Sequence, residues 1–256
     1  MTPGFDASVP NMARIYDCLL GGKDHYAADR DQAARLLAIY PPVAAMAREN
    51  RAFLARATTW AAQQGISQFL DLGAGLPAAP HTHQIAQAVN PAATTAYADA
   101  DPVVLSHARA LLASSDRVAV IAADLRDPPG VLADPRLRAV IDPARPAGVI
   151  LGAVLHFLDA DAARQVTAGY ARLMAPGSCL IISVACFDDE TLAKRLAAEY
   201  SAGTFVNHDP ADIASFLAGL IPVGPGLTEA GTWRAWIPAP VLRRREGHVL
   251  ACAARR

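Results

Sequence analysis

Apolar residues recur along the chain with two alternating spacings, one typical of helices and one typical of buried strands. Between residues 43 and 60 they follow the helical spacing, with charged residues between them, which predicts an amphipathic helix. Residues 67–72 form a short apolar run, SQFLDL, and a helical pattern through Ile85 and Val89 follows it. A strand, a turn and a helix in this order make the first part of a βαβ unit.

The same alternation repeats along the chain. Further strands are expected at residues 94–98, 118–123, 148–155 and 178–185, and helices at residues 102–113 and 159–174. Beyond residue 187 the pattern is less regular: helices are expected at residues 188–200 and 210–217, strands at residues 219–223 and 247–253, and an irregular segment at residues 227–246. The pattern predicts an α/β fold with a Rossmann-like, seven-stranded, mostly parallel sheet.

Composition limits the kinds of partner. The chain has 23 basic and 24 acidic residues and a net charge of −1, so neither a nucleic-acid footprint nor a polybasic membrane patch is expected. The N-terminus lacks the pattern of a secretory signal, and the longest apolar runs are far below the ~20 residues that a membrane span needs. The cysteines have no metal-binding spacing. We expect a cytoplasmic protein with a small-molecule partner, and the sequence leaves a homodimer open.

The first strand runs into a glycine turn within residues 69–81, FLDLGAGLPAAPH. Gly73 and Gly75 match the first two glycines of the dinucleotide fingerprint. Pro77 and Pro80 then delay the helix and remove two of the amide donors that a pyrophosphate would use. The turn therefore favours a ligand without phosphates. An NAD(P)-dependent oxidoreductase remains an alternative.

Carboxylates follow three successive predicted strands, at Asp71, Asp99 and Asp124. Because parallel strands meet at one sheet edge, these residues are expected to face one ligand, although each alone could be a turn or cap residue. Asp99 is placed to accept hydrogen bonds from ribose hydroxyls and Asp124 from an adenine amino group, with Leu125 as apolar cover. Asp71 can hold the glycine turn or a water that bridges to a ligand ammonium. S-adenosylmethionine offers these groups without a phosphate.

Several sequence blocks together resemble the bacterial S-adenosyl methyltransferase family once catalogued as DUF574, within the class I S-adenosylmethionine-dependent methyltransferases. They are ARIYDCLLGGKDHYAADR at 13–30, RENRAFL at 48–54, QFLDLGAGLP at 68–77, ADADPVVLSHARALL at 98–112, ADLRDP at 123–128 and AVLHFL at 153–158. The resemblance implies S-adenosylmethionine as cofactor and S-adenosylhomocysteine as product. It also implies that residues 1–62 form an N-terminal helical cap, or lid, and residues 63–256 the cofactor-binding Rossmann-like core. By position it implies cofactor contacts from Asp71, Gly73, Gly75, Asp99, Ala100, Asp124, Leu125 and Ala153. The chain departs from the family at Ala74 and at residues 78–80, and the acceptor does not follow from the family, whose substrates are largely unassigned.

The candidates for the reacting end are few, because positioning can supply much of the rate of methyl transfer. His156 follows the fourth predicted strand and is a candidate base or substrate contact; packing against the sheet edge is the alternative. Tyr16 is the second catalytic candidate. Together with Lys23, His25 and Tyr26 it forms a polar and aromatic cluster that could cover the cofactor or the substrate as a lid, or simply connect two helices.

Two further pairs of residues have simpler interpretations. His81 and His83 are two residues apart and do not share a helical face, so no metal site is expected. Trp233 and Trp236 are expected to seal the final strands rather than to line a pocket. We predict a methyltransferase acting on a small-molecule acceptor, with specialised metabolism as the expected context. The alternatives are another use of the sulfonium, such as cyclisation or elimination, and a sensor that binds the cofactor without turnover.

Overall fold

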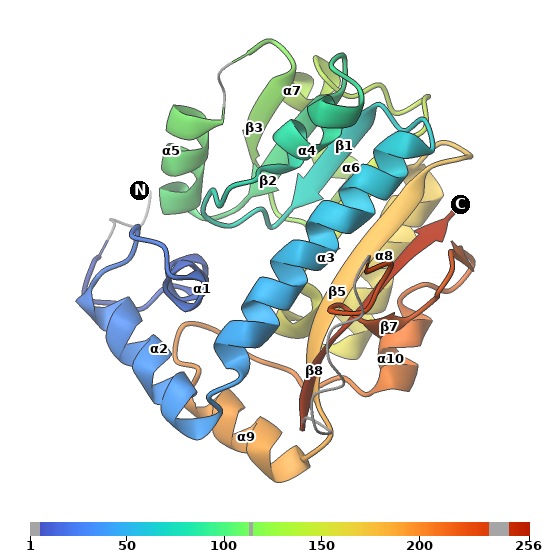
Figure 1. Cartoon of the computed structure of the whole chain (residues 1–256). Helices are drawn as coiled ribbons and strands as arrows, with labels where there is room; N and C mark the ends of the chain where they lie inside the picture. The colour runs from blue at the N-terminus through green and yellow to red at the C-terminus, as the bar shows by residue number, and fades with distance from the viewer. Residues whose placement is uncertain (1–5, 113–114, 236–245) are drawn as a thin grey trace.

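A central sheet of eight strands organises the computed structural model, which describes residues 6–112, 115–235 and 246–256 (Figure 1). In sheet order the strands are β3 (Val118–Ala122), β2 (Thr94–Asp99), β1 (Gln68–Leu72), β4 (Gly148–Gly152), β5 (Cys179–Phe187), β8 (Gly247–Arg255) and β6 (Ile221–Pro222), with β7 (Thr228–Glu229) paired to β8. The first five strands are parallel, and β8 is antiparallel to its neighbours. The predicted Rossmann-like, mostly parallel sheet is confirmed. Its order reverses between β1 and β4, where ligands bind in such sheets.

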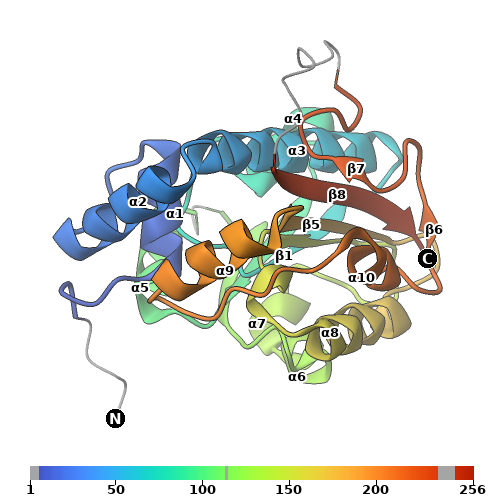
Figure 2. The same cartoon turned by 90° about the horizontal axis from the view of Figure 1, so that it is seen from below.

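Helices cover both faces of the sheet, as Figure 2 shows for α3 and α4 on one face and α6 to α8 on the other. The helices are α1 (Met12–Leu20), α2 (Ala27–Ile39), α3 (Val43–Gln63), α4 (Thr82–Val89), α5 (Pro102–Leu111), α6 (Pro128–Ala133), α7 (Pro135–Arg138), the 3-10 turn η1 (Leu155–Phe157), α8 (Ala160–Leu173), α9 (Glu190–Glu199) and α10 (Pro210–Ser215). Successive strand residues pack on opposite faces: in β1, Phe69 joins the cluster around α3 and Leu70 the cluster around α8. Within the described residues, no helix has the length and apolar character to span a bilayer.

The N-terminal helices are continuous with the core. Helix α3 crosses the sheet, and its Phe53 is fully buried in one hydrophobic cluster with Ile15 of α1 and Ile181 of β5. Helices α1 and α3 therefore share one hydrophobic core with the sheet. Trp233 is also fully buried and packs edge-on against Phe53 of α3, with ring centroids 5.2 Å apart, so it belongs to the hydrophobic core. Trp236 lies outside the described residues.

Two elements near the site and the C-terminus differ from the sequence expectations. Strand β4 ends at Gly152 rather than at residue 155, because Ala153 has a φ of 56° and turns the chain into η1. His156 therefore lies on a 3-10 turn rather than directly after a strand. The segment expected to be irregular contains β7, which adds to the edge of β8.

Candidate functional site

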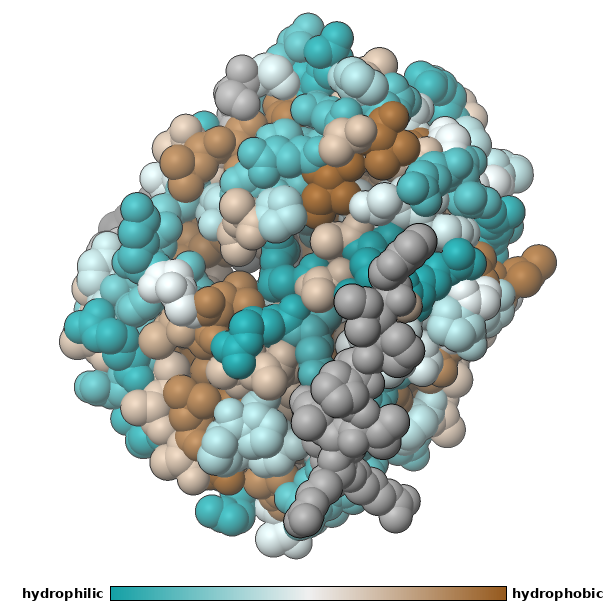
Figure 3. All heavy atoms as spheres, viewed as in Figure 1, coloured by the Kyte–Doolittle hydropathy of each residue, from teal (hydrophilic) through white to brown (hydrophobic). Residues whose placement is uncertain are grey.

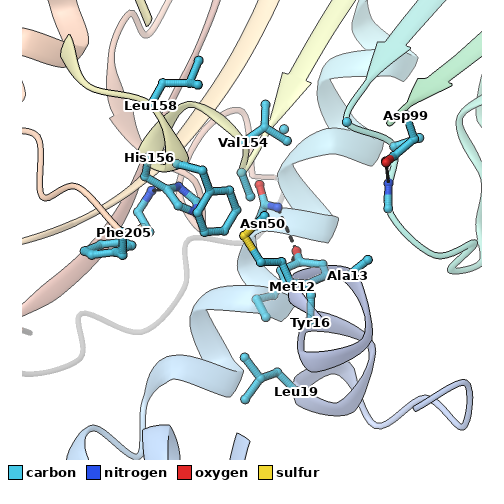
Figure 4. Close-up of a pocket in the computed structure, with 18 of the residues that line it drawn as sticks. Met12, Ala13, Tyr16, Leu19, Asn50, Asp99, Val154, His156, Leu158 and Phe205 are labelled. Atoms are coloured by element: carbon cyan, nitrogen blue, oxygen red, sulfur yellow. Dashed lines mark hydrogen bonds between the residues drawn. The ribbon is translucent and has the colours of Figure 1, made fainter. Parts of the chain in front are cut away.

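A cavity of about 440 Å³ lies at the carboxyl ends of the parallel strands. Its lining comes from α1 to α3, from the ends of β1 to β5, from η1 and from the segment that follows α9. On the face seen in Figure 3 the surface is hollowed beside α1 and α3. Figure 4 shows Asp99 on one side of the cavity, His156 and Phe205 on the other, and Asn50 between them. The volume falls within the range of ~300–1,000 Å³ that is usual for small-molecule sites.

The glycine turn is fastened to the end of β2. The amide of Gly73 donates a hydrogen bond to the carbonyl of Ala98 (2.8 Å), and the amide of Gly75 donates to the carboxylate of Asp99 (2.9 Å). Both glycines have positive φ, 64° and 65°. A Cβ on Gly73 would lie 2.5 Å from Val154, whereas a Cβ on Gly75 would meet nothing within 4 Å. The turn therefore brings bare backbone to the cavity at Gly75.

Asp99 connects the turn to the start of α5. One carboxylate oxygen accepts from the amide of Gly75, and the other accepts from the amide of Asp101 (2.9 Å). Burial raises the pKa of Asp99 above its usual value. Each oxygen keeps a further lone pair for a ligand hydroxyl. Asp101 caps α5 and accepts a hydrogen bond from the side chain of Asn11, which ties the N-terminal segment to this side of the cavity.

Asp71 lies under the turn and lines the cavity together with Arg51. The hydroxyl of Thr82 donates to its carboxylate (2.7 Å), and burial raises the pKa of Asp71 to about 6. The guanidinium of Arg51 donates to the carbonyl oxygens of Ala78 (2.6 Å) and Pro80 (3.0 Å) in the segment that follows the glycine turn. An anion and a cation are thus available in the same part of the lining, which suits an amino-acid head group.

Asp124 follows β3 and is the most exposed of the three predicted carboxylates. It forms an ion pair with Arg126 (2.6 Å). The hydrogen bonds that the side chain and the backbone amide of Arg126 donate to the carboxylate hold the pKa of Asp124 below its usual value. Asp124, Leu125 and Arg126 all line the cavity. The ionised carboxylate remains an acceptor, and Leu125 supplies an apolar surface beside it.

His156 is buried on η1 and lines the opposite side of the cavity. Its Nδ1 accepts a hydrogen bond from the amide of Ala185 (3.2 Å), so the ring carries its proton on Nε2. Burial lowers the pKa of His156 to about 3, which keeps the ring neutral. The rings of Phe157 and Phe205 have centroids 4.4 Å and 5.5 Å from that of His156.

Tyr16 lines the cavity and belongs to a buried chain of polar groups. Its hydroxyl donates to the carbonyl of Ala47 (3.1 Å) and accepts from the amide of Asn50 (2.8 Å). Asn50 in turn accepts from the hydroxyl of Ser183 (2.6 Å), whose oxygen accepts from the amide of Ala153 (3.0 Å). Burial raises the pKa of Tyr16 above its usual value. The chain fixes the backbone of Ala153, where β4 leaves the sheet.

The structure brings together some of the predicted residues and separates others. All eight predicted cofactor contacts lie in the cavity lining: Asp71, Gly73, Gly75, Asp99, Ala100, Asp124, Leu125 and Ala153. Of the predicted lid cluster, Tyr16 lines the cavity, but Lys23, His25 and Tyr26 do not. His25 instead shares a hydrogen bond of 3.0 Å with the buried carboxylate of Asp17, and the ring of Tyr26 is 42% exposed. The turn that carries them folds back on α1.

His81, His83 and three of the cysteines make contacts that stabilise the fold and do not line the cavity. His83 is buried, and its Nδ1 shares a hydrogen bond of 2.9 Å with the hydroxyl of Tyr97, while the ring of His81 stacks on it. Within the part of the chain that the structure describes, no three metal-ligating side chains form a cluster. Cys179, Cys186 and Cys252 are buried free thiols.

Sequence reasoning missed several cavity residues, above all Asn50, Arg51 and Phe205. Asn50 and Arg51 lie in RENRAFL, one of the blocks that carry the family resemblance, and they occupy the side of α3 that faces the cavity. The available signal was a polar residue, Asn50, at the helical spacing of the buried apolar residues Met46, Phe53 and Ala57. Phe205 follows α9 in a segment without periodicity, and nothing in its neighbourhood marked it.

Comparison with known proteins relates the whole chain to one family. A family described as S-adenosyl methyltransferase matches residues 2–255. A proposed methyltransferase from Thermobifida fusca YX is 38% identical, with a TM-score of 0.91 over 99% of this chain and 97% of that chain. A DUF574 family protein from Streptomyces avermitilis MA-4680 is 33% identical, with a TM-score of 0.92 over 98% and 99% of the two chains.

A more distant structure shares the fold alone. An O-methyltransferase family protein from Burkholderia thailandensis is 18% identical, with a TM-score of 0.51 over 93% of this chain and 62% of that chain. No curated protein matches the chain.

Proposed function

The chain belongs to the S-adenosyl methyltransferase family, and from this membership we propose that it transfers a methyl group to a small-molecule acceptor held in the cavity. Its cofactor is S-adenosylmethionine. Family membership does not identify the acceptor, so the acceptor has to be inferred from the residues that line the cavity.

The residues on the β1 to β3 side fit this cofactor by the chemistry of their donors and acceptors. Asp99 offers carboxylate oxygens to ribose hydroxyls, and the open space at Gly75 allows close approach of a ligand to the backbone. Asp71 and Arg51 would hold the ammonium and carboxylate of the amino-acid head. Asp124 and Leu125 would meet the adenine ring.

When bound, the cofactor would supply a methyl group on a positively charged sulfur, and this sulfur would leave as a neutral thioether as the acceptor lone pair bonds to the methyl carbon. The contribution of the protein is then to align two ligands and to exclude water. Asn50 and Tyr16 fix α1 and α3 against β5, and so close the cavity over the point where β4 ends. His156 has its Nδ1 lone pair engaged by Ala185, so it is suited to donate a hydrogen bond from Nε2 rather than to act as a base.

One observation carries the proposal: a single cavity joins the carboxylates and glycines at the ends of β1 to β3 to an uncharged side at the ends of β4 and β5. A nicotinamide dinucleotide would need donors for a pyrophosphate at the glycine turn. Here the amide of Gly73 is bonded to Ala98 and that of Gly75 to Asp99, while Pro77 has no amide hydrogen to offer.

Calorimetry followed by isotope tracing tests the proposal. Titration with S-adenosylmethionine, S-adenosylhomocysteine and NADH should show binding of the first two only. The protein is then incubated with methyl-labelled cofactor and a cell extract, and the mixture is separated by dialysis into small molecules and macromolecules. Label is expected in a small molecule that passes through the dialysis membrane. Label confined to the macromolecules, or methylthioadenosine formed in the absence of any acceptor, would overturn methyl transfer to a small molecule.

A further inference from the structure

The cavity lining is divided by charge. Among the described residues, the ionised side chains that line it are Arg51, Asp71, Asp99, Asp101, Asp124 and Arg126. The five carboxylates and guanidinium groups outside α3 lie at the ends of β1, β2 and β3. The opposite side, at the ends of β4 and β5, is lined by uncharged groups. We call this side the aromatic chamber and define it by Tyr16, His156, Phe157, Phe187, Tyr200 and Phe205.

Five rings of the aromatic chamber form a continuous arc, in the order Tyr200, Phe157, His156, Phe205 and Phe187. The centroid of Tyr200 lies 5.9 Å from that of Phe157, which lies 4.4 Å from His156. The arc continues from His156 to Phe205 over 5.5 Å and from Phe205 to Phe187 over 5.8 Å. Neighbouring rings are tilted against one another by 36° to 70°, so the arc presents both ring faces and ring edges. An aromatic ligand can pack against such rings by offset stacking or edge-on contact.

The arc is held by backbone hydrogen bonds as well as by ring contacts. The amide of Val206, next to Phe205, donates to the carbonyl of His156 (2.8 Å), and the amide of Ala185 donates to the ring of His156. Segments distant in the sequence are thereby fixed around one space. The chamber is therefore a built feature of the fold rather than a chance grouping of apolar residues.

The absence of charge on this side constrains the ligand. An ionised group placed among these rings would lose its hydration without gaining a counter-ion, and burial of an unpaired charge is strongly unfavourable. Tyr16 and Tyr200 stay neutral, because burial raises the pKa of both hydroxyls, and His156 stays neutral because burial lowers its pKa. An uncharged ligand avoids this penalty.

One directed donor remains within the arc. The proton of His156 lies on Nε2, no described residue accepts a hydrogen bond from that atom, and the atom is not among the buried polar atoms that are enclosed without a partner. It therefore borders open space, and the cavity is the open space that the side chain lines. A ligand oxygen that accepts this hydrogen bond would be oriented relative to the arc.

We propose that the acceptor is an uncharged, planar aromatic molecule that lies against the arc of the aromatic chamber and places an oxygen on the Nε2 proton of His156. This inference rests on the proposed function, since the ligand must lie beside the cofactor. The two sides of the cavity meet at residues 152–154, at the end of β4, so such a ligand faces the cofactor side across that junction.

Four naphthalenes that differ in one substituent test the proposal by calorimetry on the protein saturated with S-adenosylhomocysteine. They are 2-acetylnaphthalene, 2-ethylnaphthalene, 2-naphthoate and 2-naphthylmethylammonium. The acetyl compound should bind most tightly, and the ethyl compound, which lacks the acceptor oxygen, about five- to tenfold more weakly. The anion and the cation should each bind at least about tenfold more weakly than the acetyl compound.

Variants assign the preference to His156. His156→Phe should bind the acetyl and ethyl compounds equally. His156→Gln should keep the preference, because its carbonyl can accept from Ala185 while its amide donates. His107 lies on α5 outside the cavity lining, so His107→Phe should leave all four affinities unchanged. If His156→Phe does not fold, the wild-type ranking and the His156→Gln variant still decide.

Two kinds of failure are distinguishable. If S-adenosylhomocysteine itself does not bind, the proposed function fails. If it binds, but the four naphthalenes bind equally, bind not at all, or are led by a charged compound, the aromatic chamber does not select an uncharged planar acceptor and this inference alone is overturned.

Discussion

The side-chain amide of Asn50 donates a hydrogen bond of 2.8 Å to the hydroxyl of Tyr16, and so joins α3 to α1 inside the cavity wall. Because Asn50 also accepts from Ser183 of β5, this one side chain links the N-terminal helices to the sheet. Asn50 is only 2% exposed, so water cannot take the place of either hydrogen-bond partner if that partner is removed.

Tyr16→Phe should lower the free energy of unfolding by about 1–2 kcal/mol, because it leaves the amide of Asn50 without its acceptor. Urea denaturation measures this loss. Tyr170→Phe is the matched control: the hydroxyl of Tyr170 is buried with no hydrogen-bond partner in the described structure, so its removal should be neutral or stabilising. Equal losses in both variants would contradict the role given to the Asn50–Tyr16 hydrogen bond.

Asp99→Ala should weaken binding of S-adenosylhomocysteine by about 1–3 kcal/mol if Asp99 holds the ribose hydroxyls. Asp99 also supports the amide of Gly75, so a loss of affinity alone is ambiguous. Calorimetry with the 2′,3′-dideoxy analogue separates the two roles. A ribose contact predicts that the variant loses much less affinity for the analogue than for the parent compound, whereas equal losses would leave Asp99 only as a support of the turn.

Gly75→Ala should bind S-adenosylhomocysteine at least about tenfold more weakly, because a methyl group would occupy the space through which the ligand reaches the backbone. Gly65→Ala is the matched control, since Gly65 also has positive φ and open space around it but lies outside the cavity lining. Both variants should lose about 1 kcal/mol of stability. Unchanged affinity in Gly75→Ala would exclude close approach of the ligand at this turn.

Asp71 should make stability and binding depend on pH. Its folded pKa of about 6 lies above the value of ~3.9 in an unfolded chain, so ionisation destabilises the folded state above about pH 6, and this penalty is absent below about pH 4. Asp71→Asn should therefore be more stable than the wild type at about pH 8, by roughly 1–3 kcal/mol, and similar to it at about pH 4. Denaturation at the two pH values measures both differences.

The opposite sign is expected at Asp134, whose pKa is lowered by its hydrogen bond to Arg136. Asp134→Asn should lose stability at about pH 8, by no more than about 1 kcal/mol because the Arg136 side chain of the pair is exposed to solvent. For ligand binding, protonation of Asp71 removes the partner of the ammonium, so affinity for S-adenosylhomocysteine should weaken as the pH falls through about 6 in the wild type. A profile as flat as that of Asp71→Asn would remove Asp71 from the head-group site.

Hydrophobic spacing alone placed the parallel strands and most helices within a few residues, because burial on a sheet face imposes a period that local sequence must satisfy. The boundary errors lie where a single backbone angle ends an element. At Ala153 this angle is a positive φ, which the alanine side chain does not predict. Strand β7 was not predicted because its two residues are too few to show the alternating hydrophobic pattern of a strand.

The sequence by itself placed three carboxylates at one edge of the cavity. Asp71, Asp99 and Asp124 follow strands of a parallel sheet, and the topology of such a sheet requires their ends to meet. Only the tertiary structure decided the other side. Arg51 and Asn50 reach the cavity because α3 crosses the sheet there, and Phe205 meets His156 because the chain after α9 returns to η1. Those contacts join residues up to 133 positions apart, as between Asn50 and Ser183, and they depend on packing that no local pattern encodes.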